Sequence, residues 1–215
     1  MAPGVPEIAA TNRWLTAPIA SAATAVKSAR AERGWSSVQD VARGAAAGGV
    51  GTQGPRLLFA LAGGYALWVH GAPEPVHDVD FVVAESDVEV AAATLAAAGF
   101  TIDRTPEDWL FKACADGAVV DVLHRINGVP VDAAMIRAAR FEDVLAIRMP
   151  VLSATQVVVE KLCALTEHHC DFAALLPAMR AVREQVDWPQ VRADTADNDF
   201  VVAFLVLTDR LGITV

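Results

Sequence analysis

The stretch AGGYALWVHGAPEPVHDVDFVV, residues 62–83, decides how the chain folds. The apolar segment Arg56 to Ala62, which leads into this stretch, predicts a buried strand. The glycine pair of the stretch, Gly63-Gly64, predicts a tight turn. A short helix is expected over Tyr65 to His70, and a second strand over Val79 to Val83. A strand, a helix and a second strand in this order are typical of an α/β fold.

The residues that follow extend the same sheet. Ser86 to Ala98 is an alanine-rich segment that predicts a helix, with Ser86 and Glu89 as its capping pair and Gly99 at its end. Further short strands are expected around Phe100 to Asp103, Trp109 to Ala113 and Val119 to His124. The predicted fold class is therefore α/β, with a mixed sheet.

The chain divides into three parts, and this core is the middle one. Residues 1–55 hold two predicted packing helices, Thr11 to Arg30 and Ser37 to Ala47, and then a glycine-rich stretch. The stretch contains Gly49-x-Gly51-x-x-Gly54, a dinucleotide-binding pattern, but it precedes a strand and ends in Pro55, so we interpret it as a linker.

Residues 56–150 form the predicted core, and residues 151–215 form a helical C-terminal part. Ser153 with Gln156 predicts a capped helix that runs through His168. Further helices are expected over Asp171 to Glu184 and over Asn198 to Leu211.

Composition limits the partners and the compartment. A net charge of −9 argues against broad, non-specific phosphate binding and leaves a local basic patch as the way to hold a particular RNA. The most apolar stretch, Leu57 to Val69, is shorter than the roughly 20 residues that cross a bilayer, and no secretory signal precedes it. Three cysteines without scaffold-like spacing suit a reducing compartment, so we expect a cytoplasmic protein.

Three aspartates carry the predicted chemistry. Asp78 and Asp80 begin a strand, where the period of two places both carboxylates on one side of the sheet. Asp121 is alone in the apolar strand VVDVL, and a buried carboxylate needs a partner. If the two strands are neighbours, the three carboxylates converge, and hard oxygen ligands of this kind suit Mg²⁺, with Mn²⁺ as an alternative.

The glycine pair has two interpretations. It stands before a predicted helix, whose free N–H groups favour a phosphate, and glycine lets that phosphate come close. Alone, Gly63-Gly64 would be explained by a tight turn. The nearby aspartates favour a triphosphate bridging the turn and the metal.

A glycine pair, thirteen further residues, Asp-x-Asp and a later single strand aspartate together resemble the polymerase-β-like nucleotidyltransferase superfamily. Over about residues 56–180, the sequence is similar to the bacterial toxin branch of this superfamily, the AbiEii and MenT type. The resemblance implies that residues 56–150 are a nucleotidyltransferase core. It also implies that Lys161, in the sequence EKL, and Asp171 complete the site from the C-terminal helices, with the lysine on phosphate.

The residues just before Asp78 depart from this family pattern. Many relatives carry an arginine and a threonine where this chain has Pro75-Val76-His77. His77 is therefore the candidate for the phosphate or metal contact that those residues make in relatives, and a weakened site is the alternative.

The resemblance implies a metal-dependent enzyme that moves a nucleoside monophosphate from a nucleoside triphosphate to an acceptor. By likeness to the MenT toxins, the acceptor is the 3′ end of tRNA, and a cognate antitoxin protein is a further expected partner. Transfer to a protein hydroxyl or to a small molecule such as an aminoglycoside is the second hypothesis. A catalytically silent relative that binds a nucleotide or a partner is the third.

Overall fold

The computed structural model describes residues 19, 22–23, 57–75, 79–115, 118–145 and 147–214. Most of the predicted N-terminal helices and the whole glycine-rich linker lie outside these residues, as do His77 and Asp78. Ile19, Ala22 and Ala23 are helical and fully buried against the core.

The centre of the molecule is a seven-stranded mixed sheet in the order β3-β4-β5-β2-β1-β9-β8. β1 pairs with β9, and β2 with β5, in parallel, whereas the remaining neighbours are antiparallel. The strands are β1 (Phe59–Leu61), β2 (Val79–Val83), β3 (Thr101–Asp103), β4 (Leu110–Ala115), β5 (Ala118–Leu123), β8 (Arg140–Val144) and β9 (Ile147–Val151). A separate two-stranded hairpin consists of β6 (Arg125–Ile126) and β7 (Val129–Pro130).

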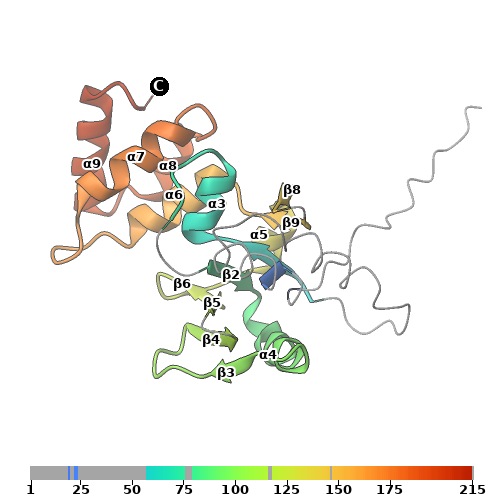
Figure 1. Ribbon diagram of the computed structural model, residues 1–215. Coiled ribbons are helices and arrows are strands. Elements are labelled where there is room, and N and C mark those ends of the chain that lie inside the picture. The colour runs from blue at the N-terminus through green and yellow to red at the C-terminus, as the bar shows by residue number, and fades with distance from the viewer. Residues whose placement is uncertain are drawn as a thin grey trace, which may run out of the picture.

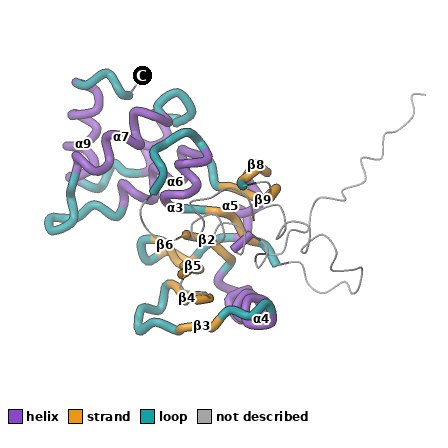
Figure 2. The backbone as a smooth tube through the Cα atoms, in the orientation of Figure 1, coloured by secondary structure: helices purple, strands orange, loops and turns teal. Residues whose placement is uncertain are grey.

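Most of the helices form two groups around this sheet, and α5 lies between them near β9 (Figure 1). They are α3 (Gly63–Val69), α4 (Val88–Ala97), α5 (Ala133–Ala138), α6 (Ala154–Cys163), α7 (Phe172–Val182), α8 (Trp188–Asp194) and α9 (Asp199–Arg210), with a 3-10 turn, η1 (Glu85–Asp87), before α4. Figure 2 shows α4 beside β3 at one end and α6, α7 and α9 grouped with α3 at the other.

The central strands have one buried and one open face. In β5, Val120 and Val122 are fully buried, while Asp121 between them is half-buried. In β4, Phe111 and Ala113 are likewise buried, and Lys112 between them is half-buried. This alternation follows from the period of two along a strand, and it leaves a polar face on β4, β5 and β2.

His70, which follows α3, fastens the C-terminal helices to the core. The Nε2 atom of His70 lies 2.8 Å from the carbonyl oxygen of Leu152, just before α6. The side-chain amide of Gln185, after α7, donates to the carbonyl of His70 at 2.6 Å. α3 also packs against α6 and β2, so it connects the C-terminal helices to the strand that carries Asp80.

The mixed α/β architecture is confirmed, and β2 has the predicted bounds. Three local expectations were wrong. The helix predicted to follow the glycine pair begins at Gly63, so the pair forms its first turn. Ser86 lies in η1 and contacts Asp87, and α4 begins without a side-chain cap. The helix expected through His168 ends at Cys163, because Thr166 and His169 exchange two backbone hydrogen bonds in a turn.

The described part of the chain contains no helix that is long and apolar enough to cross a membrane. Its three cysteines, Cys114, Cys163 and Cys170, are free thiols.

Candidate active site

Asp80 and Asp121 are direct neighbours on the open face of the sheet. They are Cα partners in the parallel pairing of β2 with β5. Adjacent strands lie about 4.8 Å apart, and partners in register point to the same face, so the two carboxylates share one small volume. The two strands are therefore neighbours, which is the condition under which the carboxylates were expected to converge. Both side chains are half-buried.

Lys112 lies on the other side of Asp121 and was not predicted. The Lys112 Nζ atom is 2.8 Å from Asp121 Oδ1 and 3.0 Å from Oδ2, and the two residues are partners across β4 and β5. Their side chains are 32% and 15% exposed, so the pair is shielded from much of the solvent. The ammonium group offsets part of the repulsion between the carboxylates of Asp121 and Asp80.

The glycine at position 63 is required by Asp80. Gly63 has φ of +58°, and a Cβ atom built on it would lie 1.9 Å from Asp80 Oδ2. The Ala62 N–H donates to the Asp80 carbonyl at 2.9 Å, which holds the start of α3 against β2. Any side chain at position 63 would therefore displace the Asp80 carboxylate or the start of α3.

Glycine is required at position 64 for a different reason. A Cβ atom on Gly64 would lie 2.9 Å from the Cβ of Pro75, so this glycine allows the backbone to pack against the segment that leads towards β2. Both glycines thus have a packing role beside Asp80. Their predicted contact with a phosphate stays a prediction.

α6 brings a further carboxylate, Glu160, towards the site. Ser153 caps α6 as predicted, since its hydroxyl accepts from the Gln156 N–H at 3.2 Å. Burial raises the pKa of the Glu160 carboxyl from 4.5 to about 7, a hydrogen bond from Gln156 and the charge of Lys161 lower it, and the charge of Asp80 raises it. Glu160 therefore interacts electrostatically with Asp80, one of the two paired carboxylates.

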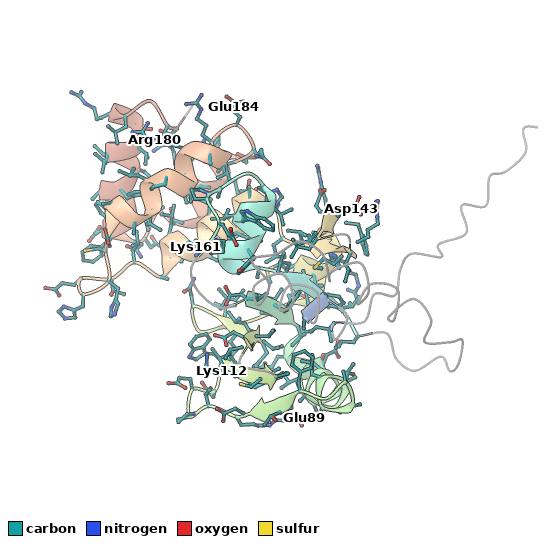
Figure 3. The ribbon with its side chains drawn as sticks, viewed as in Figure 1. Glu89, Lys112, Asp143, Lys161, Arg180 and Glu184 are labelled. Carbon is teal, nitrogen blue, oxygen red and sulfur yellow. The ribbon has the colours of Figure 1, made fainter. Side chains whose placement is uncertain are left out.

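The predicted lysine and aspartate of the C-terminal helices have different positions. Lys161 is half-buried on α6 next to Glu160, and Figure 3 shows it above the sheet that carries Lys112. Asp171 is the N-cap of α7, where its Oδ1 atom accepts from the Ala174 N–H at 3.1 Å. This aspartate therefore has a structural use in capping, and its predicted role in the site stays a prediction.

The described residues supply two of the three predicted metal ligands. Asp80 and Asp121 offer carboxylate oxygens from adjacent strands, which is the donor type that Mg²⁺ prefers. Asp121 also accepts from Lys112, and a carboxylate has about four lone-pair positions for such contacts. Within the described residues no cluster of three or more His, Cys, Asp or Glu side chains forms a metal site, and Asp78 lies outside them.

No protein-family model matches the chain, and no curated protein matches it. Among solved structures, the chain is similar to a candidate nucleotidyltransferase from Thermotoga maritima, with a TM-score of 0.40 and 19% identity over 50% of this chain and 73% of that one. It is also similar to ANT(2'')-Ia in complex with adenylyl-2''-tobramycin, with a TM-score of 0.48 and 14% identity over 70% of this chain and 88% of that one. The solution structure of the same antibiotic-resistance factor gives a TM-score of 0.44 and 13% identity over 73% and 88% of the two chains. Each likeness concerns the course of the chain and not the roles of its residues.

Proposed function

We propose that the chain is a metal-dependent nucleotidyltransferase, which moves a nucleoside monophosphate from a nucleoside triphosphate to an acceptor hydroxyl. The observation that carries this proposal is the register of β2 and β5, which places Asp80 beside Asp121. Gly63 adds to it, because the missing side chain leaves room for the Asp80 carboxylate at the start of α3.

In the proposed reaction, the acceptor oxygen forms a bond to the α-phosphorus of the triphosphate. The bond from that phosphorus to the oxygen bridging to the β-phosphate breaks, and pyrophosphate leaves with the bonding electrons. Asp121 is the candidate to take the proton of the acceptor hydroxyl, since it is a half-buried carboxylate on the open face. Most of the catalysis would come from positioning and charge neutralisation.

The proposed metal ligands are Asp80 and Asp121, with Asp78 as the third. When bound, Mg²⁺ or Mn²⁺ supplies the positive charge that stabilises the triphosphate and the leaving pyrophosphate. Lys161 and His77 are the proposed phosphate contacts, with the glycine pair beside them. Lys112 holds Asp121 in place through two hydrogen bonds.

The acceptor that the resemblance to MenT-type toxins favours is the 3′ end of tRNA. Under this proposal the chain is the toxin of a toxin–antitoxin system and meets a cognate antitoxin protein. The net charge of −9 means that a tRNA would be held by a local cluster of basic side chains, for which Lys161 beside the site is a candidate.

A small-molecule acceptor, or a protein hydroxyl, is the second candidate. The acidic balance of the chain favours it. Negative charge repels nucleic-acid phosphates and attracts cationic acceptors.

The test is nucleotide transfer by the purified chain. Each of the four nucleoside triphosphates, labelled at the α-phosphate, is incubated with Mg²⁺ and with total tRNA, a protein extract or a panel of hydroxylated amines. Label in RNA supports the tRNA acceptor, and label in a small molecule or protein supports the second candidate. If no acceptor receives label and no pyrophosphate is released, the chain is the silent relative and the proposal fails.

A further inference from the structure

A cavity of about 210 Å³ opens between the β6–β7 hairpin, α5 and α6. Its walls are mainly apolar, from Ile126, Val129, Val131, Met135 and Val159. The hairpin turns through Asn127 and Gly128, which have φ of 50° and 80°, the positive values that a two-residue type I′ turn requires. The Asn127 side chain donates to the Glu160 carbonyl at 2.9 Å, so the hairpin is fixed to α6 and the cavity is a built feature.

Three polar side chains, Asn127, Gln156 and Glu160, also line the cavity, together with Pro130 and Cys163. The Gln156 amide donates to Glu160 Oε1 at 3.1 Å, and the Asn127 amide donates to the α6 backbone. Among the described residues, no protein donor reaches the remaining oxygens, which are Glu160 Oε2, Gln156 Oε1 and Asn127 Oδ1. The polar side of the cavity therefore offers hydrogen-bond acceptors to a ligand that brings donors.

We infer that this cavity binds a small organic molecule with an apolar body and a protonated amine. The apolar walls suit the body, and the three oxygens, one of which belongs to the Glu160 carboxyl, suit an ammonium group, which has three donors and a positive charge. The volume exceeds the roughly 150 Å³ of an engineered cavity that accepts benzene, so a ring with a short chain fits.

Glu160 connects the cavity to the candidate active site electrostatically. The charged groups that act on Glu160 are Lys161, on the same helix, and Asp80, on β2. For this reason we assign a ligand held by Glu160 the role of acceptor in the transfer. This acceptor role rests on the proposed function, whereas binding to the cavity does not.

The experiment is calorimetric titration of the whole chain with 3-phenylpropylamine, without nucleotide or metal. Two comparison compounds keep the ring and the chain but replace the amine by a neutral hydroxyl or a carboxylate: 3-phenylpropan-1-ol and 3-phenylpropanoate. Glu160→Gln removes the charge from the cavity at nearly constant shape, and Glu184→Gln makes the same change at an exposed site on another surface. Val159→Phe fills the cavity without touching its charge.

The amine should bind saturably at one site, and 3-phenylpropanoate should bind at least about tenfold more weakly. Glu160→Gln and Val159→Phe should each weaken binding of the amine by about tenfold or more, while Glu184→Gln should leave the affinity for the amine within about twofold. Absence of saturable binding up to about 5 mM overturns the inference, as does equal binding of the carboxylate or no effect of both cavity variants. A chain that binds the amine but transfers no nucleotide keeps this site and loses only the proposed function.

Discussion

Gly63 shows how one residue ties the fold to the site. Its φ of +58° is the left-handed region, and the Asp80 carboxylate occupies the space of its missing side chain. Gly63→Ala should lower the free energy of unfolding by more than the roughly 1–2 kcal/mol of backbone strain alone, because Asp80 must also move. Urea denaturation measures this.

Gly212→Ala is the matched control for that substitution. Gly212 has φ of +63°, close to that of Gly63, but no atom lies within 4 Å of a Cβ built on it. This variant therefore carries the backbone strain without the collision. Equal losses in the two variants would contradict the close approach of Asp80 to Gly63.

The ion pair of Lys112 with Asp121 is shielded, and its effect on stability can be compared with that of an exposed pair. Lys112→Met leaves Asp121 beside Asp80 with its countercharge removed, so we expect a loss on the order of 1–3 kcal/mol in the free energy of unfolding. The comparison is Arg104→Met, which breaks an exposed pair with Glu89 and should change stability by no more than about 1 kcal/mol. Urea titrations of both variants give the difference, and a larger loss for Arg104→Met would contradict the account.

Glu160 should make stability depend on pH. Because its pKa is raised from 4.5 to about 7 in the folded chain, the folded state keeps a proton that the unfolded state loses over this range. Stability therefore falls as pH rises from about 4.5 to 7, by an amount on the order of 2–3 kcal/mol from this group.

Glu160→Gln removes this titration. Its melting temperature should be close to that of the natural chain at about pH 4.5 and should exceed it increasingly up to about pH 8. Glu184→Gln serves as the exposed control. A constant offset between Glu160→Gln and the natural chain across the range would show that the carboxyl is not perturbed.

Among the helices and strands, the sequence predicted the features that depend on residues close together in the chain. The alternation in VDFVV and VVDVL predicted β2 and β5 and the half-buried aspartates within them. Gly99, with φ of +91°, ends α4 as expected. The β6–β7 hairpin was missed, although its Asn127-Gly128 pair is a strong signal for a two-residue turn.

Asp171 is the element-scale test, because its side chain caps α7. Asp171→Ala should lower the free energy of unfolding by about 1 kcal/mol, whereas Asp171→Ser, which can also cap, should recover most of it. Thermal unfolding of the two variants separates them. If serine is no better than alanine, the cap is not what stabilises this helix.

At the scale of the whole molecule, the α/β class and the helical C-terminal part followed from the sequence, but the neighbours of the site did not. Lys112 meets Asp121 only through the pairing of β4 with β5, and Glu160 interacts with Asp80 only because α6 packs on α3, which packs on β2. Contacts of this kind depend on strand order and helix packing, which a local pattern of residues does not specify. The sequence therefore predicted that Asp80 and Asp121 meet if their strands are neighbours, and it missed Lys112 and Glu160.

The proposed role of Asp80 as a metal ligand is tested by the Mg²⁺-dependent release of pyrophosphate by Asp80→Asn, compared with Asp143→Asn. Asp143 is an exposed aspartate on β8, at the far edge of the same sheet, so it controls for the substitution itself. The account predicts that Asp80→Asn lowers the rate by at least about a hundredfold while Asp143→Asn stays within about twofold of the natural chain. Transfer by a folded Asp80→Asn at the natural rate would contradict it.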